Sequence, residues 1–308
     1  MSRTVIAAVD GTAESLAGAE WAADEAGRRG LPLHVLHVWQ DWSTPYAHAP
    51  FSGAATSPGA ATVSQHWAER IPREASELLQ KRHPGLTISV EQVLGNPVDV
   101  LLSAAEKAEV LVLGSRGLSA LSGFLAGSVS LPVIARATRP VVVVRAGERL
   151  KEELLPRPGA GTAEGRYRDV VLGLSLTRPC EEVIEYAFEA AASRNAALRV
   201  LHGWSMPPVF GYDPAAIDPK HGEELGLLAE RALTDAVRPW KEAFPNVEVT
   251  EQSVAGRPAD HLIEASNDAS LLVVGRRIRR TPTGIRIGPA THAVLHHATC
   301  PVAVVPHH

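Results

Sequence analysis

Cysteine is nearly absent from this sequence, which has only Cys180 and Cys300 in 308 residues. The two form no C-x-x-C pair, so neither a disulfide framework nor a cysteine zinc site is encoded, and we expect two buried, unreactive thiols. Long apolar runs are also missing, and no membrane-spanning helix is predicted. The N-terminal "MSRTVIAAVDG" reaches Asp10 too early for the apolar core of a signal peptide, which favours a cytoplasmic protein.

A surplus of positive charge is missing as well. The formal net charge is -4 and the isoelectric point is near 6.4. This balance gives no overall attraction to nucleic acid or to an anionic membrane, and neither is predicted as a partner. The apolar share of 45% is typical of soluble globular domains, and the length suits two of them.

Several signatures of catalysis and of nucleotide binding do not occur. There is no Gly-Lys pair, hence no Walker A loop, and no G-x-G-x-x-G, hence no Rossmann dinucleotide fingerprint. No Ser-His-Asp or Cys-His arrangement is recognisable, so we predict no catalytic residue. His292 and His296 have the i, i+4 spacing of a metal-binding pair, but they lack a third ligand at a recognisable spacing. A surface helix face is the favoured interpretation, and no metal ligand is predicted.

What the sequence does contain is an internal repeat. Residues 93–117 align without gaps with 254–278, and upstream 28–39 aligns with 193–204. The first strand, 5–12, aligns with 170–177 in the same upstream register. The chain is therefore predicted to hold two copies of one domain, at 1–146 and 169–308, joined by a linker at 147–168 that is rich in proline, glycine and charge.

Within each copy, short runs of Val, Leu and Ile alternate with longer amphipathic stretches, as in β-α-β units. We predict an α/β fold of two tandem Rossmann-like domains, each a five-stranded, mainly parallel sheet flanked by about four helices. The segment 41–62, heavy in Pro, Ser and Ala, is predicted to be a long loop. In the first copy we predict strands at 3–9, 32–39, 87–94, 109–114 and 140–145, and helices near 12–30, 64–83, 96–106 and 128–137.

The glycine-rich stretch "GSRGLSALSGFLAGSVS" at 114–130 follows the fourth predicted strand and leads into a predicted helix. Ligands of open parallel sheets bind beyond the carboxyl ends of the strands, where strand order reverses. Glycines that admit a close approach, free N–H groups at a helix start and serine hydroxyls would suit a phosphate there. A glycine-rich surface loop capped by Ser128 explains the same residues. The residues alone leave both interpretations open.

Gly114, Gly117, Gly127 and Ser128 have the spacing G-x2-G-x9-G-S, which resembles the ATP-binding signature of the universal stress protein family. The resemblance extends over nearly the whole of both copies. It implies tandem adenine-nucleotide α-hydrolase-like domains that bind ATP, with Mg²⁺ where a carboxylate would otherwise face the triphosphate. For Asp10, capping of the helix that starts at Thr12 is the alternative. The resemblance implies Ala8, Val9, Asp10 and Val38 on the nucleoside side, and Gly114, Arg116, Gly117, Gly127, Ser128, Val129 and Ser130 on the phosphate side.

The second copy departs from this pattern at four positions. Ile278 replaces Gly117 and Pro289 replaces Ser128, while Ser175 replaces Asp10 and Gly203 replaces Val38. A β-branched side chain and a proline both hinder backbone contact with phosphate, so we predict that ATP binds mainly in the first copy. The basic residues of the second loop favour a solvated loop over an anion or partner site; they are Arg276, Arg277, Arg279, Arg280 and Arg286.

The resemblance implies an ATP-binding regulator of stress or dormancy, in which the nucleotide controls conformation or partner choice. Efficient ATP turnover is not predicted, and slow hydrolysis stays open. A nucleotide-independent scaffold is the main alternative. An adenylating enzyme is disfavoured, because "AVDGTAES" lacks both H-I-G-H and S-G-G-x-D-S. The resemblance also implies that the last strands, 140–145 and 301–306, pair the two copies within the chain, and further homodimerisation is left open.

Overall fold

The computed structural model describes residues 3–40, 58–115, 128–146, 167–177, 179–204, 219–278 and 287–308. The chain divides into two compact units, Met1–Ala146 and Gly147–His308. Most of the predicted linker, 147–166, lies outside the described residues, so its boundaries stay a prediction.

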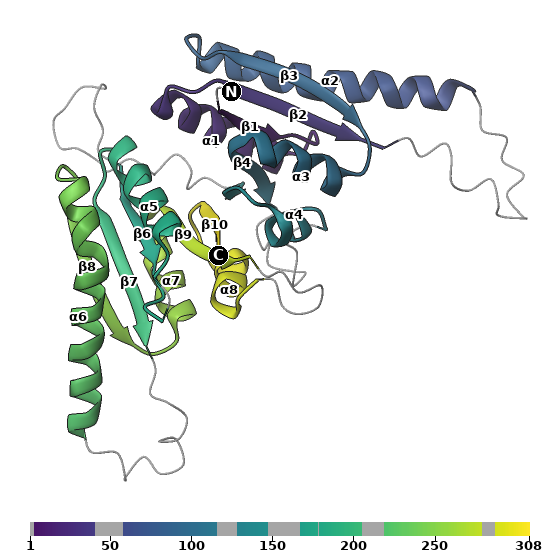
Figure 1. Cartoon of the computed structure of the whole chain (residues 1–308). Coiled ribbons are helices and arrows are strands. Elements are labelled where there is room, and N and C mark those ends of the chain that lie inside the picture. The colour runs from purple at the N-terminus through teal and green to yellow at the C-terminus, as the bar shows by residue number, and fades with distance from the viewer. Residues whose placement is uncertain are drawn as a thin grey trace, which may run out of the picture. The chain divides into compact units, whose positions relative to one another are not determined.

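The N-terminal unit is a parallel sheet with strand order β3-β2-β1-β4-β5. Helices α1 and α2 contact each other and pack on one face, while α3 and α4 contact each other and cover the other face, as right-handed crossovers require (Figure 1). Strand order reverses between β1 and β4. The strands are β1 (Thr4–Ala8), β2 (Leu33–Trp39), β3 (Ile88–Leu94), β4 (Ala108–Ser115) and β5 (Val141–Arg145), and the helices are α1 (Ala13–Arg29), α2 (Pro58–Arg82), α3 (Pro97–Lys107) and α4 (Ser130–Arg136).

The C-terminal unit repeats this plan. Its parallel strands lie in the order β10-β9-β6-β7-β8, with α5 and α6 in mutual contact and α7 in contact with α8. The predicted α/β fold of two tandem domains is thus confirmed. The strands are β6 (Asp169–Gly173), β7 (Leu198–Trp204), β8 (Val249–Ala255), β9 (Ala269–Arg277) and β10 (Val302–His307), and the helices are α5 (Glu181–Ser193), α6 (Pro219–Ala243), α7 (Pro258–Ala265), the short 3₁₀ helix η4 (Ser266–Asp268) and α8 (Pro289–His297).

Helix α2 begins earlier than predicted. The sequence suggested a loop through residue 62, whereas the helix starts at Pro58. A proline is tolerated at a helix start because its missing N–H would have no intrahelical acceptor there. Ala60 and Ala61, which follow it, are strong helix formers. The predicted loop therefore extended more than one helical turn too far, because residues 58–62 belong to α2.

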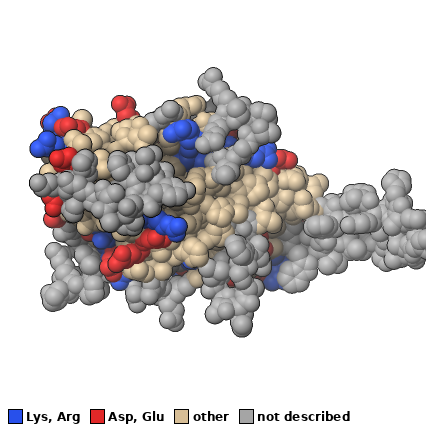
Figure 2. Space-filling model, turned by 90° about the horizontal axis from the view of Figure 1, so that it is seen from below, with Lys and Arg blue, Asp and Glu red and all other residues tan. Residues whose placement is uncertain are grey.

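Charged side chains of both signs share the surface. Figure 2 shows Lys and Arg beside Asp and Glu on one face of the molecule. Uncharged residues form much of the described surface in this view. This mixture agrees with the small formal net charge of -4.

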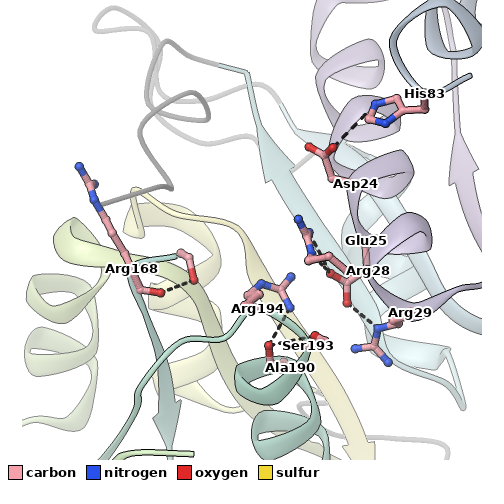
Figure 3. Close-up of polar contacts among 10 residues, drawn as sticks. Asp24, Glu25, Arg28, Arg29, His83, Arg168, Ala190, Ser193 and Arg194 are labelled. Atoms are coloured by element: carbon pink, nitrogen blue, oxygen red, sulfur yellow. Dashed lines mark hydrogen bonds and ion pairs between the residues drawn. The ribbon is translucent and has the colours of Figure 1, made fainter. Parts of the chain in front are cut away.

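One charge cluster is buried in the N-terminal unit. The Glu25 carboxylate of α1 is fully buried and accepts hydrogen bonds from Arg28, at 3.0 Å, and from Arg29, at 2.5 Å (Figure 3). Arg29 also lies 3.8 Å from the Glu109 carboxylate at the start of β4. These contacts tie the end of α1 to the amino edge of the sheet, opposite the edge where the candidate site lies.

Candidate functional site

The carboxyl ends of three neighbouring strands meet at one edge of the N-terminal sheet. Ala8, at the end of β1, is in register with Leu36 of β2 on one side and with Leu113 of β4 on the other. Val38 lies two residues beyond Leu36, and Gly114 directly follows Leu113. The structure therefore brings Ala8, Val9, Val38 and Gly114 together at the reversal of strand order, where ligands of this sheet type bind.

A buried histidine holds the end of β1 in place. The Nδ1 atom of His37 lies 2.7 Å from the carbonyl oxygen of Val9, and the residue is 6% exposed. A carbonyl can only accept, so the imidazole proton is on Nδ1 and Nε2 is left as the acceptor in the neutral ring. His202 makes the same contact with Leu174 in the C-terminal unit, at 2.9 Å. Sequence reasoning did not select these histidines, although "LHV" and "LHG" recur at the two strand ends.

Asp10 braces the turn between β1 and α1. Its Oδ1 accepts from the backbone N–H of Thr12 at 3.0 Å and from the Thr12 hydroxyl at 2.6 Å. Thr12 itself is the N-cap of α1, since its side chain accepts from the N–H of Ser15. Asp10 therefore supports the helix cap without being the capping residue. Asp10 is exposed to solvent.

Gly114 ends β4 against the first turn of α1. A β-carbon at Gly114 would lie 2.6 Å from the Cα of Ser15, closer than such atoms approach in proteins. Gly18, one turn later, faces the same point, where its own β-carbon would lie 3.0 Å from the Gly114 nitrogen. Glycine is thus required at 114 for close packing of helix on strand, whatever the loop beyond it binds.

The phosphate-side residues are only partly described. Arg116, Gly117 and Gly127 lie outside the described residues. Ser128 is exposed and Ser130 is buried. Helix α4 begins at Ser130, with Val129 as an N-cap that makes no side-chain bond. The helix predicted to start at 128 therefore starts two residues later, and its N-cap is Val129 rather than Ser128, the cap of the alternative interpretation. Pro132 falls in the first turn, where a missing N–H costs nothing.

The corresponding edge of the C-terminal unit is built differently. Gly203, at the place of Val38, lies so close to α7 that a β-carbon there would be 2.7 Å from the Cα of Pro258. Pro289 begins α8, and the N–H of Ile278 donates to His307 O at 2.6 Å. The basic loop is not wholly solvated as expected, because Arg276 is 4% exposed while Arg277 is exposed; Arg279, Arg280 and Arg286 lie outside the described residues.

The cysteines and the histidine pair complete the candidate groups. Cys300 is buried, but Cys180 is only half-buried, and both are free. Burial, followed by the hydrogen bond to Glu182, raises the pKa of the Cys180 thiol to about 11, which makes it a poor nucleophile.

The Nε2 atoms of His292 and His296 lie 3.3 Å apart. In the parts of the chain that the structure describes, no group of three or more His, Cys, Asp or Glu side chains could hold a metal.

Comparison with known proteins identifies the family. The family model of the universal stress proteins matches the chain twice, at residues 1–145 and 166–306. The chain belongs to the universal stress protein family. Among its relatives, the universal stress protein Rv2005c of Mycobacterium tuberculosis is 31% identical over 307 residues, covering 97% of this chain and 96% of the relative. A universal stress protein of Mycolicibacterium smegmatis is 30% identical, covering 98% and 96%.

Solved universal stress proteins share the fold. A structure from Archaeoglobus fulgidus aligns with a TM-score of 0.68 at 17% identity, covering 99% of each chain. At that identity the likeness extends to the fold alone. As for membranes, none of the described helices combines the length and apolarity needed to cross a bilayer.

Proposed function

We propose that the N-terminal unit binds ATP at the carboxyl edge of its sheet and that this chain acts through nucleotide binding in the response to stress or dormancy. The observation that carries this proposal is the meeting of Ala8, Val38 and Gly114 at the strand-order reversal, from which the G-x2-G-x9-G-S stretch begins. The stretch that resembles a phosphate-binding signature thus begins at the carboxyl edge of the sheet, where parallel sheets of this kind bind ligands.

The nucleoside would lie against the ends of β1 and β2. The backbone at Ala8 and Val9 ends β1, and the His37 contact fixes the Val9 carbonyl. Val38 would supply an apolar wall and backbone bonds. The Asp10 carboxylate can accept from a sugar hydroxyl or an amine, and Mg²⁺ would be needed wherever it approaches the triphosphate.

The phosphates would lie along the 114–130 stretch. Glycine at 117 and 127 admits close backbone approach, while Ser128, Ser130 and Arg116 offer hydroxyl and guanidinium donors. Ser128 is exposed at the end of the loop, and this exposure supports a role in binding phosphate. Because the sequence holds no recognisable catalytic set, the proposed activity is binding without efficient turnover, in the cytoplasm.

The last strand of each unit is the proposed pairing edge. β5 and β10 each end the strand order of their own unit, and an uncovered edge strand is a template for pairing. We propose that the two copies pair through them within one chain. Sedimentation of the whole protein tests the alternative, a homodimer in which these strands pair between chains, because a homodimer has twice the mass of the single chain.

Calorimetric titration with ATP tests the nucleotide proposal. One site per chain is expected, and Gly117→Asp should abolish it by adding bulk and negative charge beside the phosphates. Ile278→Asp, at the repeat-equivalent position of the second copy, is the matched control and should leave ATP affinity unchanged. Two equivalent sites, or unchanged binding by Gly117→Asp, would overturn the assignment. A chain that binds no nucleotide at all, and yields none by mass spectrometry after purification, would be a scaffold instead.

A further inference from the structure

The C-terminal unit contains a cavity of about 700 Å³ at the carboxyl ends of β6, β7 and β9. Its volume lies within the range of small-molecule sites, roughly 300 to 1,000 Å³. The walls come from the loop between β6 and α5, from the ends of β7 and β9, and from the first turns of α7 and α8. All of these elements belong to one unit, so the cavity is a property of that domain alone.

The cavity opens because helix α5 starts late. α1 begins at Ala13, whereas α5 begins at Glu181, whose repeat equivalent is Leu16. Pro179 stands in the segment that would otherwise form the missing turn. Thr177 and Cys180 line the cavity instead of continuing a helix.

The end of β9 also lacks the tight helix contact seen in the first unit. The atoms nearest to a β-carbon at Gly275 would be side-chain atoms, from the His307 ring at 3.0 Å and from Val183 at 3.3 Å. At the equivalent Gly114 it would meet the backbone of α1. Side chains therefore separate strand from helix in the C-terminal unit, which leaves room beside them.

Apolar side chains form much of the cavity wall. Leu174, Leu201, Leu262 and Val274 line it, and each is at most 6% exposed. The Pro258 ring packs over Gly203, where the first unit has the proposed nucleoside wall. This wall suits a compact apolar body.

The polar groups around the cavity favour a negative charge. The exposed Arg277 at the end of β9 is in register with His307 of β10, and among the described residues no carboxylate forms an ion pair with Arg277. The first hydrogen bond of α8 runs from His292 N–H to Gly288 O, at 2.9 Å. The N–H groups of Ala290 and Thr291 come before this bond, so they have no acceptor within α8 and can donate hydrogen bonds to a ligand.

No carboxylate lines the described part of the cavity. The Glu182 carboxylate, which does not line the cavity, accepts at 2.7 Å from the thiol of Cys180, which does. Ser175 stands where the first unit has Asp10, so the charged carboxylate acceptor for sugar hydroxyls is replaced by a neutral hydroxyl. Ile278 and Pro289 replace two phosphate-loop residues, which hinders backbone contact with a chain of phosphates.

We propose that this cavity is a second ligand site, for an organic anion that carries one negatively charged group on an apolar body. The charged group lies between Arg277 and the start of α8, and the apolar body lies against the leucine wall. The site is independent of the ATP site proposed for the N-terminal unit, and its ligand is not a nucleoside triphosphate.

The test uses 8-anilinonaphthalene-1-sulfonate, a sulfonate on an aromatic body, titrated into the full-length protein by fluorescence and calorimetry. One saturable site per chain is expected. Arg277→Glu should weaken it by about tenfold or more, because a charge-assisted contact becomes a repulsion. Arg231→Glu, an exposed residue of α6 that does not line the cavity, is the matched control and should change affinity less than about twofold.

Thr177, an exposed residue that lines the cavity, offers a second test. Thr177→Trp places a large side chain at the mouth and should reduce probe binding with ATP affinity unchanged; circular dichroism of both variants shows whether they are folded. Equal affinities of Arg277→Glu and Arg231→Glu would overturn the proposed role of charge. Probe binding that survives Thr177→Trp would place the probe elsewhere. Competitive displacement of the probe by ATP in the Gly117→Asp background would make the cavity a nucleotide site and refute the ligand class.

Discussion

Gly114 and Ser15 are packed so closely that a β-carbon on Gly114 would lie 2.6 Å from the Cα of Ser15. The atoms in the way are backbone atoms of α1, which cannot move without shifting the helix. Gly114→Ala should therefore lower the free energy of unfolding of the N-terminal unit by about 1 to 3 kcal/mol, as overpacking does. Urea denaturation followed by intrinsic fluorescence measures this loss.

Gly27→Ala is the control for that experiment. Gly27 lies in the same helix, and a β-carbon there meets nothing within 4 Å. Alanine is the better helix former, so stability should stay level or rise by about 0.5 to 1 kcal/mol. If both variants lost stability equally, the strand-to-helix contact at Gly114 would not be the cause.

The cap of α1 gives a second prediction. Thr12 accepts from the Ser15 N–H at 3.2 Å and donates to Asp10, so Thr12→Ala should cost about 1 kcal/mol of unfolding free energy. The chain supplies its own control, because Thr177 occupies the same repeat position but α5 is capped at Cys180 without a side-chain bond. Thr177→Ala should change stability by less than about 0.5 kcal/mol. An equal loss in both thermal melts would contradict the capping role of Thr12.

The strands of this fold could be predicted closely because each is a short apolar run between polar or turn residues. β5, for example, was predicted at 140–145 and is found at Val141–Arg145. The edge that gathers Ala8, Val38 and Gly114 followed from strand order and needed no side-chain detail. Such features depend on local pattern and topology, which the sequence carries directly.

Other features depend on contacts between distant residues and could not be predicted. In the sequence His37 is an ordinary strand residue, and its hydrogen bond to the Val9 carbonyl is seen only in the structure. Pro179, which accounts for the late start of α5, is visible in the sequence. The packing of His307, from the C-terminal end of the unit, beside Gly275 is not, and this packing also shapes the cavity. The start of α4 was misplaced because a serine before an apolar run resembles an N-cap, whereas here Val129 takes that position.

Cys180 should be unusually slow to alkylate. Burial and the Glu182 hydrogen bond raise its pKa to about 11 from a model-peptide value of 9.0. The rate of reaction with iodoacetamide, followed at the Cys180 peptide by mass spectrometry, should keep rising with pH until about 11 in the native protein. In the urea-unfolded chain it should level off near 9.0. Because the native thiol keeps its proton in that interval, this group's contribution to stability is lost as pH rises from 9.0 to about 11.

Glu182→Gln is the variant that separates the two causes. It removes the negative charge and the carboxylate acceptor, both of which disfavour the thiolate. The Cys180 pKa should fall, and alkylation near pH 8 should be faster than in the unchanged protein. A native rate that already levels off at pH 9.0 would mean that burial and Glu182 do not perturb the thiol.

The buried Glu25 cluster gives the last prediction. Glu25 is fully buried against Arg28 and Arg29, whose side chains are only 11% and 10% exposed (Figure 3). Glu25→Gln keeps the shape of the side chain but leaves two largely buried cations without this carboxylate, which should cost about 3 kcal/mol or more.

Glu74 provides the comparison, because it pairs with Arg70 at the same i, i+4 spacing but is 62% exposed. Solvent screens that pair, so Glu74→Gln should change the unfolding free energy by no more than about 0.5 kcal/mol. The C-terminal unit has Ala190 at the position of Glu25, and there Arg194 donates to the Ala190 carbonyl at 3.1 Å. Urea denaturation measures the loss in Glu25→Gln, and a loss no larger than that of Glu74→Gln would show that burial adds nothing to this pair.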